Sequence, residues 1–125
     1  MADLQRRLQN EVEKFQAIQK DLQKAISARQ QLDAQLNENT LVKEEMDRVD
    51  ESSTVYKLVG PVLVKQDLSE ARNNVQKRID YINGELKRYD GILKDMEKKQ
   101  ESHRDTLTKL QHQFQQAQVK AAAKA

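Results

Sequence analysis

The 125-residue sequence contains no cysteine, so neither a disulfide framework nor a thiolate metal site can form. That absence suits a reducing compartment. With 37% hydrophobic and only 4% aromatic residues, there is too little apolar material for a thick globular core. No run approaches the roughly 18 consecutive apolar residues of a membrane span, and the first residues, Met1 to Arg6, lack the apolar block of a signal peptide. We therefore expect a soluble, cytoplasmic protein with no membrane partner.

The sequence also lacks an excess of either charge. Lysine and arginine number 22 against 20 acidic residues, and the two signs alternate along the chain. This pattern gives no electrostatic argument for nucleic-acid binding. The mildly basic, alanine-rich end has two lysines, Lys120 and Lys124, too few to hold a nucleic-acid strand or an anionic membrane. We expect residues 119–125 to form a disordered tail.

Features of catalytic and metal sites are equally scarce. The two histidines, His103 and His112, are nine residues apart, whereas two ligands on one helix need a spacing of three or four. No glycine-rich phosphate loop appears. We predict no catalytic residues, no metal and no cofactor, and we interpret His103 as part of a polar, register-setting layer with Gln100.

Only three glycines and one proline occur, which favours long helices. Neither residue type falls between Asp3 and Asp50, where apolar residues recur at steps of three and four. This stripe comprises Leu4, Leu8, Val12, Phe15, Ile18, Leu22, Ala25, Leu32, Leu36 and Met46. The spacing predicts one amphipathic helix over residues 3–50. Because Arg29 and Asn39 fall on the stripe, and Val12 and Ile26 sit beside it, we expect local drift of its register.

The second half of the chain predicts a more regular helix over residues 67–118. Its a and d positions follow steps of four and three for six heptads: Val75, Ile79, Ile82, Leu86, Tyr89, Leu93, Met96, Gln100, His103, Leu107, Leu110, Phe114 and Ala117. Asp67 can cap the first amides of this helix, with Glu70 at its third position. The pattern is that of a coiled-coil seam.

Between the helices, residues 54–65 are rich in β-branched and aromatic residues and predict two strands around Gly60 and Pro61. Such a hairpin turns the chain back, so that the helices can pair antiparallel. The fold class is therefore mainly α: an antiparallel coiled coil of two long helices joined by one central β-hairpin. A pair of helices cannot cover so many apolar strand residues, and open edges pair with other strands. We expect hairpins of several subunits to assemble into a common sheet or β-barrel through Val55, Tyr56, Leu58, Val59, Gly60, Pro61, Val62, Leu63 and Val64.

The two chain ends meet at the other end of the predicted coiled coil. Leu4, Leu8, Val12 and Phe15 then lie across from Leu107, Leu110, Phe114 and Ala117. Helix ends fray, so these side chains could grip an unfolded polypeptide without reading its sequence. The alternative is that they are ordinary coiled-coil core.

Several segments resemble the β-class subunits of prefoldin. They are residues 55–66 (VYKLVGPVLVKQ), 69–72 (SEAR), 78–82 (RIDYI), 28–39 (ARQQLDAQLNEN) and 42–45 (VKEE). The resemblance spans nearly the whole chain as a single subunit, residues 1–125. It implies a hexamer of two α-class and four β-class subunits, whose hairpins form a double β-barrel with six coiled-coil tentacles. It also implies an ATP-independent holdase that passes unfolded clients, such as actin and tubulin, to a cytosolic chaperonin.

Two other functions remain open from the residues alone. One is a structural or tethering coiled-coil subunit that binds no unfolded client. The apolar hairpin counts against it, because a spacer has no use for apolar strands. The other is an accessory subunit of an enzyme, which would need surface patches specific for its partner.

Overall fold

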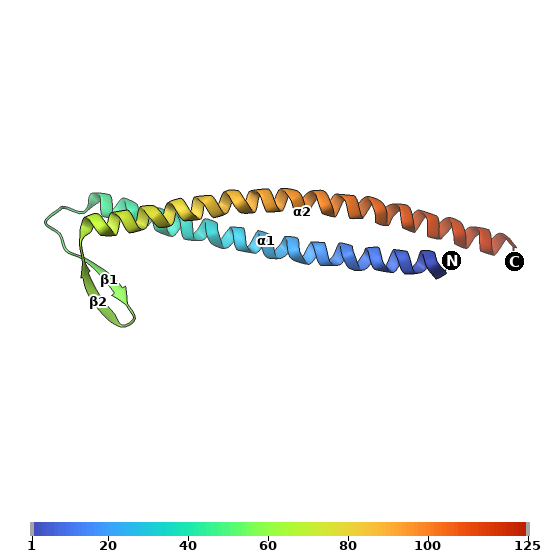
Figure 1. The fold of residues 1–125 in the computed structure, drawn as a ribbon, viewed down its shortest axis with the longest axis horizontal. Coiled ribbons are helices and arrows are strands. Elements are labelled where there is room, and N and C mark those ends of the chain that lie inside the picture. The colour runs from blue at the N-terminus through green and yellow to red at the C-terminus, as the bar shows by residue number, and fades with distance from the viewer. Residues whose placement is uncertain (1, 125) are drawn as a thin grey trace. The chain divides into compact units, whose positions relative to one another are not determined.

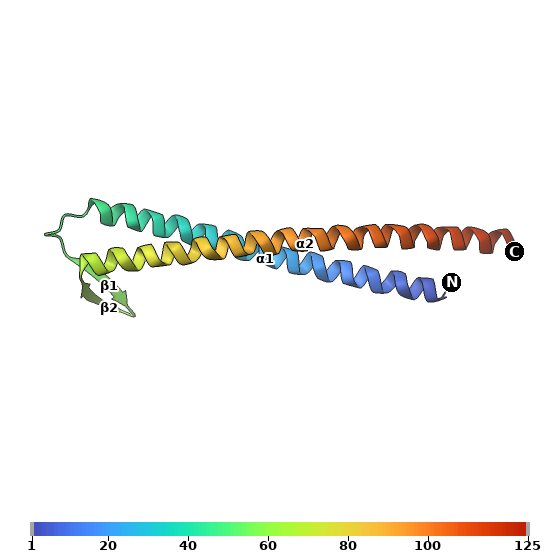
Figure 2. The same ribbon diagram turned by 45° about the horizontal axis from the view of Figure 1, so that its top comes forward.

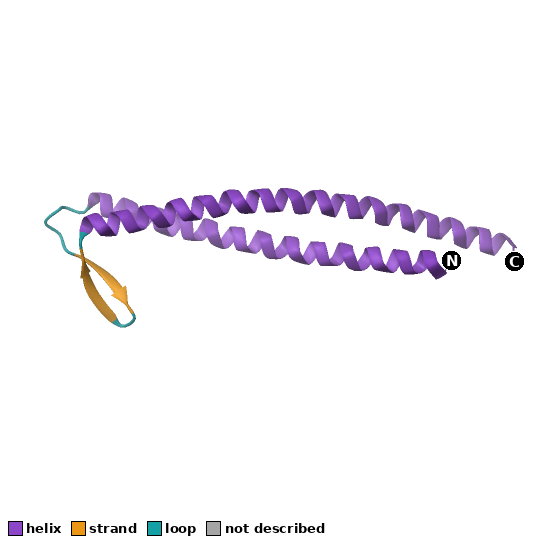
Figure 3. Ribbon diagram, in the orientation of Figure 1, coloured by secondary structure: helices purple, strands orange, loops and turns teal. Residues whose placement is uncertain are grey.

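The computed structural model describes residues 2–124. It contains a helix α1 (Ala2–Arg48), strands β1 (Val55–Val59) and β2 (Val62–Gln66), and a helix α2 (Leu68–Lys124) (Figure 1 and Figure 3). The prediction of two long helices flanking one hairpin is confirmed. Neither helix, over the part of the chain described, has an apolar stretch long enough to cross a membrane.

The chain divides into two compact units. The terminal unit combines the first 27 residues with residues 90 onward, and the hairpin unit comprises Ala28–Tyr89. In each unit a segment of α1 lies beside a segment of α2 that runs in the opposite direction (Figures 1 and 2). The antiparallel pairing predicted from the two stripes is therefore present in both.

In the hairpin unit, the core lies along the predicted seam of α2. The buried residues there are Ala71, Val75, Ile79, Ile82 and Leu86, which expose between 2% and 9% of their surface. They recur at steps of three and four, so one face of α2 packs against α1 and the opposite face meets solvent. Every residue of the seam predicted over Val75–Ala117 is buried or half-buried, in both units.

In the terminal unit, Ala25 and Leu110 are the buried residues, with 6% and 5% exposure. The α1 seam follows an unbroken spacing of four and three through Leu8, Glu11 and Phe15. Glu11, which the list of apolar residues left out, therefore occupies the seam position next to Val12, which we expected beside the stripe. Val12 is half-buried beside it.

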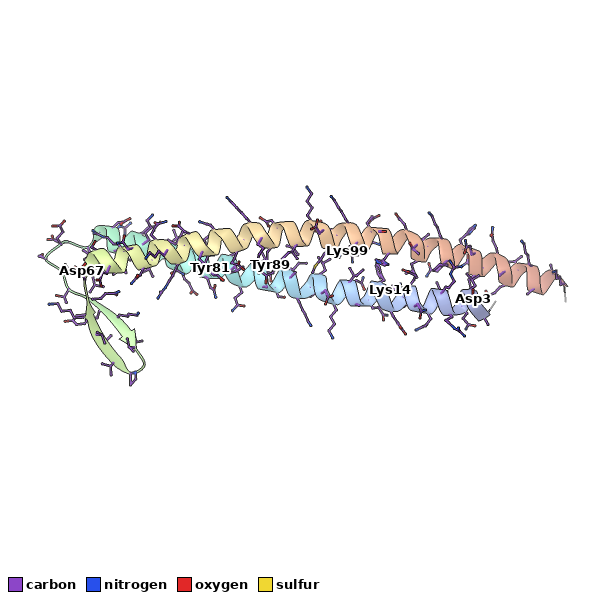
Figure 4. All side chains as sticks on the ribbon, viewed as in Figure 1. Asp3, Lys14, Asp67, Tyr81, Tyr89 and Lys99 are labelled. Carbon is purple, nitrogen blue, oxygen red and sulfur yellow. The ribbon has the colours of Figure 1, made fainter. Side chains whose placement is uncertain are left out.

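The start of α2 has the predicted cap, which is formed by Asp67 (labelled in Figure 4). The Glu70 amide donates a hydrogen bond to Asp67 Oδ2 at 3.2 Å, and the Ala71 amide donates to the Asp67 carbonyl at 2.9 Å. The side chain of Asp67 thereby satisfies one of the amides that lack partners in a first helical turn, and its carbonyl accepts the first bond of the helix.

The end of α2 differs from the prediction. Residues 119–124 are helical rather than disordered, and α2 ends at Lys124 rather than at residue 118. Alanine, which is frequent in this segment, has the highest helix propensity and lets the helix continue without a packing partner. Within the terminal unit, α2 consequently runs past the start of α1 (Figures 1 and 2). Ala125 lies outside the described residues.

The hairpin pairs Val55 with Gln66 at its base and Val59 with Val62 at its tip. Its two loop residues are Gly60, with a φ of +57°, and Pro61. Positive φ at the first loop residue and the fixed negative φ of proline at the second are those of a type II′ turn. That turn matches the right-handed twist of the strands, which explains the position of the glycine.

Candidate functional site

Most of the large apolar side chains that are exposed among the described residues lie on the hairpin. Leu58 and Leu63 expose 68% and 64% of their surface, and Tyr56, Val59, Val62 and Val64 are exposed as well. Val55 is half-buried, whereas Gly60 and Pro61 are exposed at the turn. Within residues 2–124 the sheet has only two strands, so the outer edge of each strand is unpaired. Water is left in contact with both apolar side chains and free backbone groups.

The register places apolar side chains on both faces of the hairpin. Residues directly opposite each other point to the same face, and successive residues alternate. One face carries the pair Val59–Val62 together with Val64, and the other carries the pair Leu58–Leu63. A single covering layer would leave one of these faces in water.

The apolar surface continues from the hairpin onto α1. A groove of about 150 Å³ lies between the base of the hairpin and the helices, with Val42 and Met46 on one side and Val55 and Tyr56 on another. Val42 and its neighbour Leu41 are 43% and 62% exposed. Leu41 and Val42 were not among the residues predicted to take part in assembly. The sequence could have indicated them, because two adjacent aliphatic residues that lie off the predicted seam are not needed for the pairing of the helices.

An arginine of α2 holds the end of α1. Arg72 Nη2 donates to the carbonyl oxygens of Met46 at 2.9 Å and Val49 at 3.4 Å, and its Nε donates to Met46 at 3.3 Å. The last carbonyls of a helix have no partners within it, so this side chain acts as a C-cap supplied by the other helix. Nothing in the sequence spacing indicated this role.

The eight residues predicted to bind clients all belong to the terminal unit. Leu110 is buried, and the other seven, Leu4, Leu8, Val12, Phe15, Leu107, Phe114 and Ala117, are half-buried. These side chains lie at or next to the contact between α1 and α2, and they do not form an open apolar patch. Binding through them therefore requires the helix pair to open locally.

The polar layer of this unit differs from the predicted one. His103 Nδ1 lies 2.9 Å from Glu11 Oε2 on the opposite helix, and the two side chains are 30% and 15% exposed. The partner of His103 is therefore Glu11, rather than Gln100. Lys14 Nζ approaches Glu11 from the same helix at 3.8 Å, and the Arg104 guanidinium lies 5.8 Å from the Phe15 ring centre.

One carboxylate on the surface has a perturbed pKa. The Arg88 guanidinium donates hydrogen bonds to both oxygens of Glu85, the shortest at 2.8 Å. These bonds hold the pKa of Glu85 below its usual value and raise that of Arg88. Arg88 also lies over the Tyr89 ring, 4.9 Å from its centre. Among the described residues, no group of three or more His, Cys, Asp or Glu side chains could hold a metal ion.

The chain is similar to several characterised sequences over nearly its full length. It is 57% identical to prefoldin subunit 6 of Mus musculus, an alignment that covers 100% of both chains. It is 57% identical to prefoldin subunit 6 of Homo sapiens over 98% of this chain and 95% of that protein. The corresponding protein of Arabidopsis thaliana is 53% identical over 94% of this chain and 91% of its own length.

The fold has a counterpart among solved structures. The crystal structure of the prefoldin β subunit from Thermococcus strain KS-1 matches with a TM-score of 0.75 and 19% identity, covering 82% of this chain and 90% of that one. The family model described as prefoldin subunit matches residues 9–114, which include both strands and most of both helices. The resemblance predicted from the hairpin sequence is confirmed, and the chain belongs to the prefoldin family.

Proposed function

We propose that this chain is a β-class subunit of a hexameric, ATP-independent chaperone with two α-class and four β-class subunits. The observation that carries the proposal is the hairpin, whose two open edges and two apolar faces are unsatisfied in a single chain. Open strand edges are normally paired or covered. Neighbouring subunits of the same family carry the partner strands.

Assembly through the hairpin pairs the free backbone groups at the strand edges and covers the exposed apolar side chains. Strands added at the edges of β1 and β2 pair the free backbone groups, and closure into a barrel leaves no edge. The side chains of one face then fill the barrel, while those of the other need a second layer. The exposed Leu41 and Val42 of α1 belong to the surface that such a layer can use. The residues that we assign to assembly are those predicted for the hairpin, Val55 to Val64.

The terminal unit is the proposed client-binding element. The seam ends there with leucine and phenylalanine side chains, and the last turns of a helix pair open most easily. Opening exposes apolar groups that bind any unfolded chain weakly. Several such ends around one cavity raise the avidity while each single contact stays reversible.

The clients, the acceptor and the location that we propose are supported by the likeness to the prefoldin family. We assign the chain to the cytoplasm, with unfolded proteins such as actin and tubulin as clients and a cytosolic chaperonin as the acceptor. Non-covalent capture and release need no catalytic group, so the proposal includes no enzymatic activity, cofactor or metal. A tethering coiled coil without client binding remains the alternative function.

The proposal is tested with the complex assembled from the full set of subunits. The complex should delay aggregation of a chemically denatured protein in the absence of ATP, and a tethering protein should not. Removing roughly 15 residues from each end of this chain should preserve assembly but weaken the delay, because fraying ends are lost. Removing residues 119–125 alone is the matched control, since it leaves all eight predicted client-binding residues in place. Undiminished protection by the doubly truncated chain would contradict the assignment of the client site.

A further inference from the structure

The seam of the terminal unit is apolar except at three positions. On α1 the exception is Glu11, and on α2 the exceptions are Gln100 and His103. The remaining seam positions carry Leu4, Leu8, Phe15, Ile18, Leu22, Ala25, Leu93, Met96, Leu107, Leu110, Phe114 and Ala117. Large apolar residues at most layers fit one another in several alignments, so the apolar layers alone specify the pairing weakly.

Glu11 and His103 are the polar residues that meet across this seam. His103 Nδ1 and Glu11 Oε2 lie within hydrogen-bonding distance at 2.9 Å, and a carboxylate oxygen accepts this bond when the imidazole Nδ1 carries the hydrogen. Both side chains are largely withdrawn from water, with 15% of Glu11 and 30% of His103 exposed. A polar group in such a place is costly when it has no partner.

Sliding one helix along the other by a heptad removes this contact in either direction. In the observed register, Glu11 lies opposite His103. A slide by seven residues one way places Glu11 opposite Leu110 and His103 opposite Ile18. The opposite slide brings Met96 to Glu11 and Leu4 to His103. Each alternative therefore places both groups against aliphatic side chains, where His103 has lost Glu11 and Glu11 keeps only the 3.8 Å contact with Lys14 of its own helix.

We infer that the Glu11–His103 pair fixes the register of α1 against α2 in the terminal unit. The connection through residues 49–67 and the hydrogen bonds of Arg72 constrain the register at the other ends of the helices, and the Glu11–His103 pair constrains it within the terminal unit. A single polar layer in an apolar seam is a known means of specifying alignment at some cost in stability. The inference concerns the same unit as the proposed client site, but its test needs no client and does not depend on that function.

The register is measured with two spin labels on the full-length chain. Gln16 on α1 and Lys99 on α2 are exposed, Lys99 is visible in Figure 4, and the absence of native cysteine allows specific labelling at both. The unsubstituted chain should give one distance population. Glu11→Leu combined with His103→Leu should keep the helical content but add populations that correspond to slides of about 10 Å along the axis, one heptad of rise.

Three variants distinguish the polar pair from a merely structural effect. Exchanging the two residues, Glu11→His with His103→Glu, should restore a single population, because the same contact forms in reverse. The single substitution Glu11→Gln should also give one distance population, since the side-chain oxygen of glutamine still accepts a hydrogen bond from His103. Lys14→Gln is the matched control: it removes only the contact of Glu11 within α1 and should leave one population.

Two outcomes overturn the inference. The first is a double-leucine variant that keeps its helical content and the single, unshifted distance, because this result means that the pair does not select the register. The second is an exchanged pair with several populations. None of these measurements involves client binding, so a failed register test is distinguishable from failure of the proposed function, which is judged by aggregation.

Discussion

The Arg72 guanidinium donates two hydrogen bonds to the backbone carbonyl of Met46, 26 residues earlier in the chain. Met46 belongs to the last turn of α1, and Arg72 to the second turn of α2. The end of one helix and the beginning of the next are thereby joined beside the hairpin. This link sets where the chain enters and leaves the strands.

Replacing Arg72 should destabilise the hairpin unit. Arg72→Ala removes the charged hydrogen bonds to the Met46 and Val49 carbonyls and leaves Met46 only the bond from the Val49 amide at 3.3 Å. Hydrogen bonds from a charged group are worth about 1.5–3 kcal/mol. We expect a loss of that size in the free energy of unfolding, measured with urea. Lys87→Ala, an exposed substitution on the same helix, serves as the control. Equal midpoints for the two variants would mean that the cap does not stabilise the fold.

The glycines should respond to alanine with opposite signs. Gly60 has a φ of +57° and open space around it, so Gly60→Ala meets only backbone strain and should cost about 1–2 kcal/mol. Gly84 also has open space but lies inside α2, and Gly84→Ala should stabilise by up to about 1 kcal/mol. Thermal unfolding of the two variants, compared with the unsubstituted chain, measures both effects. A stabilising Gly60→Ala would refute the turn assignment.

Charges on either face of the hairpin should block assembly. Leu58→Lys and Val64→Lys place an ammonium group on opposite faces, as the register dictates. Because both faces need covering, each variant should remain monomeric when mixed with the partner subunits, with unchanged helical content. Native mass spectrometry gives the composition. Thr54→Lys, an exposed residue just before β1, should assemble normally, and normal assembly of both strand variants would rule out the hairpin as the interface.

The Glu85–Arg88 pair predicts a pH effect. Arg88 holds the pKa of Glu85 below its usual value, so the pair contributes stability above the unfolded-state pKa and loses it as the pH falls through the folded-state value. Arg88→Gln should therefore raise the pKa of Glu85 towards its usual value, as measured by NMR titration. Lys87→Gln should leave it unchanged. An unshifted pKa of Glu85 in the Arg88 variant would mean that the guanidinium is not the cause of the perturbation.

The sequence predicted the elements well because their signals are periodic. The spacing from Val75 to Ala117 identified the packed face of α2, and Gly60 with Pro61 located the turn. Glu11 was missed because only apolar residues were counted, although its place in the four-three spacing was visible. Arg72 could not have been found, since a bond from a side chain to a distant carbonyl leaves no periodic trace. Whether the eight terminal residues bind clients stays a prediction.

The two open edges of the hairpin also bear on how much of this protein a cell can hold safely. A newly made chain that has not met its partner subunits exposes unpaired strand edges. These edges can pair with those of other unassembled chains, and such pairing promotes insoluble aggregates. Synthesis in excess of its partners would therefore produce material that must be degraded. We expect its abundance to follow that of the scarcest subunit in the assembly.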